Sequence, residues 1–174
     1  ILTHIGRFNE QKNHEGLLRA FALIHEKHPL TRLNLLGDGE LLEQTRALAK
    51  TLGLSDSVDF LGSQSNVYPY LQNSDLFLLP SRYEGMPMTL IEAMGTGLPI
   101  VASKVGGVPD MLEDGKSAIL TDCNPEKVAQ AVCRMLEDEA LRKTLGRAAK
   151  ADSETFSAAH MAESYVRVYR AEGA

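Results

Sequence analysis

Short runs of apolar residues alternate along the chain with longer segments in which apolar residues recur every three or four positions. The short runs predict strands, and the longer segments predict amphipathic helices. The predicted strands are residues 1–6, 31–37, 57–62, 75–80, 99–103 and 117–121. The predicted helices are residues 13–28, 41–52, 67–72, 88–96, 108–113, 125–137, 139–150 and 157–171.

Regular alternation of strands and helices predicts an α/β fold with a doubly wound parallel sheet of about six strands and helices on both faces. The run at 75–80 is almost wholly apolar, which is typical of a strand buried on both faces. Because no repeat or internal linker interrupts the pattern, we expect residues 1–174 to form a single domain. In such sheets ligands bind beyond the carboxyl ends of the strands, so the loops that leave each strand are the candidate site.

Composition narrows the class of protein. The chain has 174 residues, of which 44% are apolar and 24% charged, with a net charge of −5. An acidic balance disfavours generic binding to nucleic acid, whose partners are usually basic. No apolar run approaches the length of a membrane span, and no secretory signal is visible. The two cysteines lack the spacing of a metal site. We therefore expect a cytoplasmic protein.

A dinucleotide site is the first candidate among these loops. Gly37 and Gly39 follow a predicted strand and open a helix, as in the G-x-G-x-x-G fingerprint. Leu42 stands where the third glycine belongs, and the strand is the second of the chain instead of the first. These departures disfavour a nicotinamide or flavin cofactor. The phosphate-binding GxxxxGK[ST] motif is not present in the sequence.

A diphosphate site on cations is the second candidate. Arg7 and Lys12 lie in the loop after the first strand, close to the start of a helix. A bound diphosphate needs its charge offset by cations or by a metal. The sequence has no acidic cluster that resembles a metal site, so we expect no metal and no cofactor. The competing interpretation is that Arg7 and Lys12 are solvated surface charges.

The stretch EGMPMTLIEAM places one carboxylate before a helix and another inside it, at Glu84 and Glu92. Pro87 suits the first helical turn, and a helix start favours phosphate. Carboxylates beside a phosphate-binding helix start suit a ligand that offers hydroxyl groups on both sides of the phosphates. That ligand is a nucleotide sugar. Two unrelated surface charges are the alternative.

The motifs together resemble those of the glycosyl transferases group 1 family (GT4), the retaining glycosyltransferases of GT-B fold. EGMPMTLIEAMGTGLPIVAS is similar to the E-x7-E region of that family, Gly6-Arg7 with Lys12 to its diphosphate motif, and VDFLG to its base-contacting segment. Gly106-Gly107 resembles its second glycine loop, and residues 156–169 resemble its closing helix. The resemblance covers essentially the whole chain, with the motifs in the right order.

The resemblance implies a role for each matching residue. Arg7 and Lys12 would bind the donor diphosphate, Glu84 would hold hydroxyl groups of the donor sugar, and these three form the catalytic set. Glu92 would hold the ribose hydroxyls, and Phe60 with its neighbours would place the base through backbone groups. The implied donor-binding set is Gly6, Arg7, Lys12, Gly37, Gly39, Phe60, Glu84, Gly85, Met86, Met88, Thr89, Glu92, Gly106 and Gly107.

The resemblance also implies what lies outside the chain. A GT-B enzyme has a second, N-terminal domain that binds the acceptor, and that domain is not in this sequence. The full-length enzyme would move a hexose from a nucleoside diphosphate sugar, by default UDP, to an unknown acceptor with retention, and the fragment alone would not transfer sugar. Peripheral association with the inner face of a membrane is compatible with this. The closing helix would pack on the missing half, so we expect Tyr165 and Tyr169 to be exposed.

Two alternatives remain at this stage. The same architecture serves nucleotide-sugar epimerases and phosphorylases, and a non-catalytic nucleotide-sugar-binding module would keep the same residues. The family commonly has glutamate where this chain has Asp110, which we leave out of the site. The five histidines show no telling spacing from a carboxylate, and we assign none of them a catalytic role.

Overall fold

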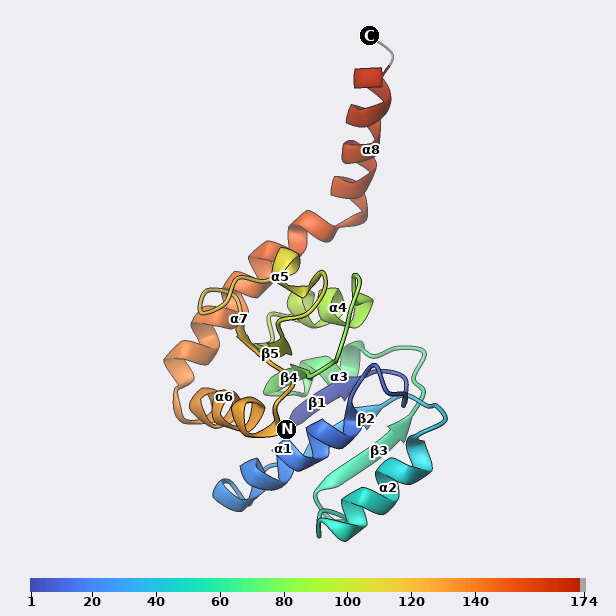
Figure 1. The fold of residues 1–174 in the computed structure, drawn as a ribbon. Coiled ribbons are helices and arrows are strands. Elements are labelled where there is room, and N and C mark those ends of the chain that lie inside the picture. The colour runs from blue at the N-terminus through green and yellow to red at the C-terminus, as the bar shows by residue number, and fades with distance from the viewer. Residues whose placement is uncertain (173–174) are drawn as a thin grey trace.

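The computed structural model describes residues 1–172, and it is built around one six-stranded parallel sheet (Figure 1). The strand order is β3-β2-β1-β4-β5-β6, so the chain starts in the middle, builds outward to one edge and then returns to build the other half. The strands are β1 (Leu2–Ile5), β2 (Leu33–Leu36), β3 (Val58–Gly62), β4 (Leu76–Leu79), β5 (Ile100–Ser103) and β6 (Ile119–Thr121).

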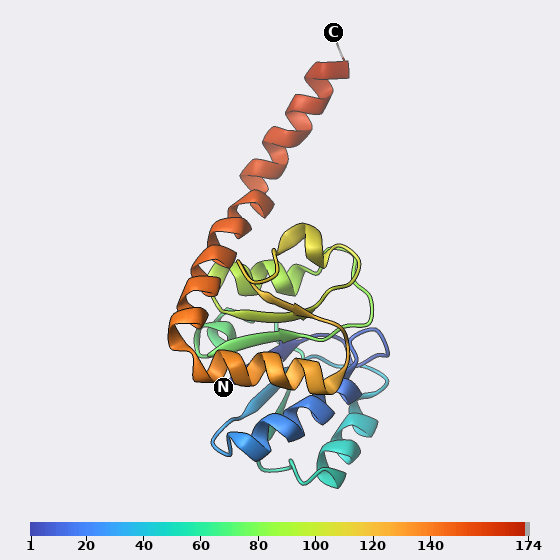
Figure 2. The ribbon, with the colours of Figure 1, turned by 60° about the vertical axis from the view of Figure 1, so that its left-hand side comes forward.

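Helices cover both faces of the sheet (Figures 1 and 2). Their bounds are α1 (His14–Lys27), α2 (Leu42–Thr51), α3 (Tyr68–Gln72), α4 (Met88–Thr96), α5 (Val108–Met111), α6 (Pro125–Glu137), α7 (Glu139–Ser153) and α8 (Ala158–Glu172), with a 3₁₀ turn at Glu154–Phe156. The predicted doubly wound α/β fold is confirmed, and a helix or strand occurs at each predicted segment.

The core has two layers, one on each face of the sheet. Leu76 and Leu78 of β4 point to the layer that α1, α2 and α6 cover. Phe77 and Leu79 alternate with them and point to the layer of α3, α4 and α5. All four side chains are fully buried, which explains why residues 76–79 are apolar at every position instead of alternating.

Local sequence fixes where the helices around the sheet start. The Asn124 side chain accepts a hydrogen bond from the Lys127 amide, and Pro125 occupies the first position of α6. Asn13 does the same for α1 by accepting from the Gly16 amide, in the left-handed conformation with φ 55°. The first helix after β1 therefore starts abruptly after the loop 6–13, and this holds the loop at the carboxyl edge of the sheet.

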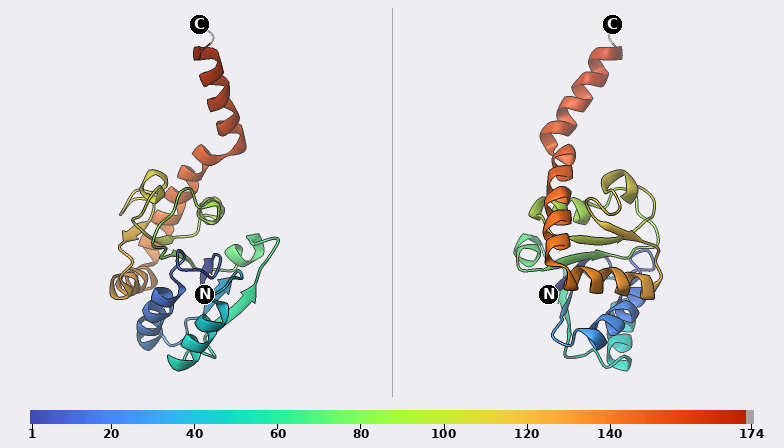
Figure 3. Two further views of the ribbon diagram at one scale, coloured as in Figure 1. Left: turned by 45° about the vertical axis from the view of Figure 1, so that its right-hand side comes forward. Right: turned by 90° about the vertical axis from the view of Figure 1, so that its left-hand side faces the viewer.

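Helix α8 leaves the body of the domain and runs away from the sheet (Figures 1, 2 and 3). Met161, Val166 and Val168 are exposed along it, as are Tyr165 and Tyr169. The expected exposure of the two tyrosines is confirmed. No helix within residues 1–172 is long and apolar enough to cross a membrane.

Candidate functional site

The chain leaves the two central strands of the sheet toward opposite faces. β1 and β4 are neighbours in the sheet, yet β1 leads to α1 on one face and β4 leads to α4 on the other. This is the switch point of a doubly wound sheet, where such folds bind their ligands. The loops 6–13 and 80–87 form its two sides, and they carry the cations and the carboxylate that the sequence singles out.

Lys12 and Glu84 form an ion pair across this switch point. Lys12 Nζ lies 2.6 Å from Glu84 Oε1, and only 14% and 4% of the two side chains are exposed. The Gln11 side chain donates to Glu84 Oε2 at 3.4 Å and to the Tyr83 carbonyl at 3.1 Å. The Glu84 carboxylate is therefore almost completely shielded from solvent, and one cation lies close to it. The structure brings together two residues of the predicted catalytic set that are 72 positions apart in the sequence.

Arg7, the third member of that set, turns toward a different loop. Its guanidinium lies 3.3 Å from the Glu40 carboxylate, and both side chains are exposed. Exposed pairs of this kind hold together weakly, so the guanidinium is free to exchange Glu40 for another anion. The structure places Arg7 at the rim, in the same loop as Lys12 but outside the Lys12–Glu84 pair.

The start of α4 faces the same edge with backbone donors. Pro87 is the residue directly before the helix, which begins at Met88 as the sequence predicted, and its carbonyl accepts from the Leu90 amide at 3.0 Å. Among the hydrogen bonds of residues 1–172, none uses the amides of Met88 or Thr89. The hydroxyl of Thr89 is buried and also lacks a partner there. Free amides and the dipole of the helix favour an anion at this point.

Glu92 lies in the second turn of α4, on the same loop-and-helix unit as Glu84. Partial burial raises the pKa of its carboxyl. It makes no ion pair with another residue of the described chain. An unpaired, partly desolvated carboxylate next to free amides is a suitable acceptor for hydroxyl groups.

Four of the six predicted site glycines pack against backbone of the neighbouring loops. A Cβ on Gly106, where φ is 51°, would lie 1.8 Å from the Glu84 carbonyl oxygen. A Cβ on Gly37 would lie 2.0 Å from the carbonyl oxygen of Gly6. Gly39 and Gly107 meet backbone in the same way. These glycines are required for loop-to-loop contact, whatever else they touch. Gly85 has no neighbour that a Cβ would meet.

The side chain of Phe60 packs on the α2 side of the sheet. The Arg46 guanidinium lies 4.4 Å above its ring, and Phe8 stacks at 6.1 Å. The ring of Phe60 is therefore already in contact with two side chains. Met86 and Met88 flank the start of α4 and are exposed.

Two buried histidines under the loop 6–13 were not assigned a role from the sequence. His4 is fully buried, with Nδ1 2.8 Å from the Leu78 carbonyl. Burial lowers its pKa to about 4. Its ring centre lies 4.8 Å from that of His14 in an edge-to-face contact. Both rings therefore stay neutral in this position. Only their place, in a strand and just after Lys12, could have drawn attention to them.

Comparison with known proteins decides the family. The profile of the family described as "Glycosyl transferases group 1" matches residues 1–152. The chain belongs to the glycosyl transferases group 1 family. The resemblance drawn from its motifs is thereby confirmed. The N-acetyl-alpha-D-glucosaminyl L-malate synthase of Bacillus anthracis is 34% identical to this group 1 chain over 171 residues, which cover 97% of this chain and 45% of that protein.

Other group 1 proteins agree with this assignment. The lipopolysaccharide core biosynthesis glycosyltransferase LpsD of Rhizobium meliloti is 32% identical over 171 residues, 97% of this chain and 49% of that protein. Anabaena HepE, solved in complex with UDP-glucose, superposes with a TM-score of 0.90 at 25% identity, over 98% of this chain and 48% of that one.

A second solved structure shares the fold and is of similar size. The C-terminal domain of a glycosyl transferase group 1 family protein from Francisella tularensis gives a TM-score of 0.80 at 20% identity. The match covers 88% of this chain and 84% of that one. By contrast, the group 1 chain spans about half the length of the curated relatives it matches.

Proposed function

We propose that the group 1 domain is the donor-binding half of a retaining glycosyltransferase that transfers a hexose from UDP-sugar to an acceptor. The observation that carries the proposal is the Lys12–Glu84 ion pair at the switch point, beside the free amides of α4. A ligand that is anionic at one end and hydroxylated at the other can bind both groups of this pair. The cation would bind the anionic end, and the carboxylate would accept hydrogen bonds from the hydroxyl groups.

The diphosphate would take the cationic half. It would accept hydrogen bonds from Lys12 and from the Met88 and Thr89 amides, and Arg7 would exchange Glu40 for a phosphate oxygen. These donors would also stabilise the negative charge that develops on the departing nucleotide as the bond to the sugar breaks. Because the cations and the helix start supply this stabilisation, the proposal needs no metal. Within residues 1–172, no group of three or more His, Cys, Asp or Glu side chains is placed to hold one.

The sugars would take the carboxylates. Glu84 would accept hydrogen bonds from hydroxyls of the transferred hexose, and Glu92 from the ribose, while Gly85 and Met86 would line the space between them. The base would lie against the backbone at Phe60. Support for UDP comes from HepE, which was solved with UDP-glucose and is 25% identical to this chain. The proposed retention of configuration rests on the family.

A second domain is part of the proposal. The chain spans about half the length of its relatives, and α8 carries an exposed row that includes Met161, Tyr165 and Tyr169. We infer that an acceptor-binding domain completes the enzyme and covers this row. The isolated domain is then expected to bind the donor but not to transfer sugar.

Titration calorimetry tests the proposal directly. UDP and UDP-glucose should bind the 174-residue chain, and Lys12→Ala should weaken UDP about ten- to a hundredfold, the equivalent of one hydrogen bond to a charged group. Lys143→Ala is the matched control, because Lys143 makes an exposed pair on α7 and its loss changes the net charge equally. EDTA should leave both affinities unchanged. UDP binding that collapses in EDTA, or that survives loss of Lys12, would contradict the proposed site.

A further inference from the structure

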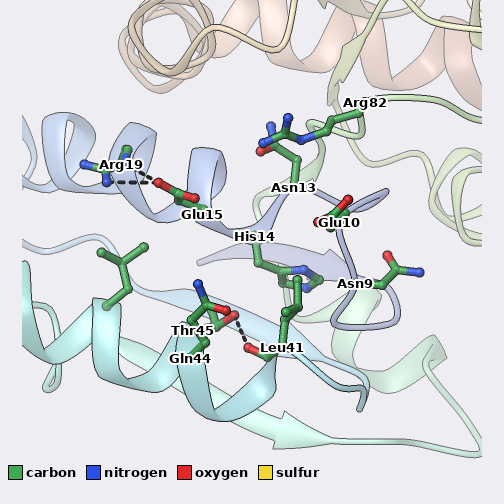
Figure 4. A pocket seen from close by; sticks show the side chains of 11 residues that line it. Asn9, Glu10, Asn13, His14, Glu15, Arg19, Leu41, Gln44, Thr45 and Arg82 are labelled. Atoms are coloured by element: carbon green, nitrogen blue, oxygen red, sulfur yellow. Dashed lines mark hydrogen bonds and ion pairs between the residues drawn. The ribbon is translucent and has the colours of Figure 1, made fainter.

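A cavity of about 460 Å³ adjoins the proposed donor site (Figure 4). Asn9 and Glu10 line it, so it shares the loop 6–13 with Lys12, and its other walls come from the first turns of α1, from α2 and from Arg82. Its volume lies within the range of small-molecule sites, which is roughly 300–1,000 Å³.

A second hollow extends this cavity into a groove. It measures about 250 Å³ and shares Asn13, Glu15, Arg19 and Arg82 with the first. It continues to Cys123 and Pro125, at the start of α6. The groove therefore crosses the first turn of α1 from the α2 side to the α6 side, and this elongated form suits a chain of linked units better than a single compact ligand.

His14 is an unpartnered polar group in the wall of this cavity. The residue is 2% exposed, and neither ring nitrogen has a hydrogen-bond partner among residues 1–172. Figure 4 shows the ring pointing from α1 toward the side that α2 forms. Phe8 stacks on the ring at 4.0 Å. Buried polar atoms are normally paired, so the two unpaired nitrogens mark a polar group beside the cavity that a hydrogen-bonding ligand can satisfy once the ring turns toward it.

The imidazole is neutral, so it offers one donor and one acceptor. Burial, with smaller effects of His4 and Lys12, lowers its pKa to about 2. A hydroxyl group also donates and accepts, and so it can pair with either nitrogen. A phosphate or carboxylate oxygen can pair only with the nitrogen that carries hydrogen.

The charges of the groove also disfavour an anion. Arg19 donates to Glu15 at 2.9 and 3.1 Å, so these two charges cancel. Glu10 and Arg82 remain, one of each sign. The start of α1 is already capped, because the Asn13 side chain accepts from the Gly16 amide at 3.3 Å. What is left is a polar lining whose positive and negative charges balance.

We infer that the groove is a second carbohydrate subsite, which binds a neutral oligosaccharide. Amide and carboxylate side chains such as Asn9, Gln44 and Glu10 pair with hydroxyls, and Leu41 and Leu48 offer an apolar surface to the carbon faces of a sugar. The oligosaccharide is assigned to the acceptor glycan, away from the hydroxyl that reacts, and this assignment rests on the proposed function. The loop 6–13 would then touch donor and acceptor at once.

NMR titration of the 174-residue chain with maltotetraose, cellotetraose and chitotetraose tests this inference. At least one should shift the side-chain amide signals of Asn9 and Gln44 and the ring signals of His14, in the presence of saturating UDP. Gln44 and Arg82 are exposed, so Gln44→Ala and Arg82→Ala are expected to leave the fold intact. Each should weaken that binding about two- to tenfold, as expected for one hydrogen bond. His14→Phe keeps the stack on Phe8 and should weaken it further. Gln64→Ala, outside the groove, is the control.

Each other outcome overturns the inference. If no tetrasaccharide moves these signals, or if the variants bind as well as the wild type, the groove is not the subsite. If inorganic phosphate moves the same signals, the site selects anions. If glucose, mannose or N-acetylglucosamine alone binds as tightly as the tetrasaccharides, the oligosaccharide assignment is wrong. UDP binding is read from signals of Lys12 and Met88 in the same samples, so a failed donor site is distinguished from a failed groove.

Discussion

Replacing Glu84 by glutamine should tighten the binding of UDP while it weakens the binding of UDP-sugar. In the free domain, Lys12 neutralises a carboxylate that is only 4% exposed. When UDP binds without a sugar, the diphosphate draws Lys12 away and places two to three negative charges near Glu84. Binding of UDP to the wild type therefore breaks or weakens a buried ion pair, which lowers the affinity. Glutamine at position 84 carries no charge, so the variant has no such pair to lose.

The structure sets the size of the effect. Removing one partner of a buried ion pair costs about 3–5 kcal/mol. Lys12 is only displaced, and its three N–H donors can serve carboxylate and phosphate together, so a smaller value applies. We take the lower end of the range for a hydrogen bond to a charged group, about 1.5 kcal/mol. Glu84→Gln should then bind UDP about tenfold more tightly. UDP-glucose should instead bind more weakly to the variant, because its sugar hydroxyls lose a charged acceptor.

Calorimetry with both ligands on wild type and variant measures the ratio of the two affinities. Glu92→Gln is the matched control: it removes a carboxylate from the same region, but one without an ion-pair partner in the described chain, and it should weaken both ligands alike. Equal weakening of UDP and UDP-glucose by Glu84→Gln would refute the reasoning. So would a UDP affinity that does not change.

The same pair makes a prediction for the ligand-free domain. Lys12→Met leaves Glu84 buried without its cation and should lower the free energy of unfolding by about 2–3 kcal/mol, less than for a fully buried pair because Lys12 is 14% exposed. Adding Glu84→Gln should restore most of this loss. Chemical denaturation of both variants measures it, and a double variant as unstable as Lys12→Met would show that the charge of Glu84 is not the cause.

Three further predictions concern the rest of the site and α8. Because partial burial raises the pKa of the Glu92 carboxyl, this group gains a proton at higher pH than an ordinary glutamate. UDP-glucose, whose diphosphate has no group that titrates near neutral pH, should therefore bind less tightly to the wild type on mild acidification, and Glu92→Gln should remove most of this loss. The contribution of this group to stability should fall as pH rises through its pKa, and denaturation at several pH values checks that sign. Gly106→Ala should lower the free energy of unfolding by about 2 kcal/mol or more, because its Cβ meets backbone at 1.8 Å with φ at 51°, whereas Gly85→Ala should change it by less than about 0.5 kcal/mol. Deleting residues 158–174 should leave the melting temperature of the domain unchanged, and a large drop would mean that α8 stabilises the domain alone.

The fold could be read from the sequence because its signals are local. The apolar run of β4, the stripes of α1 and α6, and the asparagine caps are each visible within a few residues. The start of α4 directly after Pro87 is a local signal as well, since proline favours the start of a helix.

The contacts within the site could not be read in the same way. Lys12 and Glu84 are recognisable as candidates, but their ion pair joins loops that are distant in sequence and depends on how the sheet brings them together. The environments of His14 and Phe60 are equally non-local, because the first depends on Phe8 and α2 and the second on Arg46. Strand order predicts which loops meet, but not which atoms touch.

The glycine contacts around Glu84 change how a mutational scan of this family should be interpreted. Gly106 packs against the backbone of Glu84, and Gly107 packs against the backbone of Gly85. A larger residue at either position would therefore displace the Glu84 carboxylate, which is proposed to bind the sugar. Such variants would lose activity as completely as substitutions at Glu84 itself, and a scan scored by activity alone would group them with ligand-contacting residues. Measuring abundance and activity together would separate positions that shape the pocket from positions that bind in it. This distinction decides which residues are useful for redesigning donor preference.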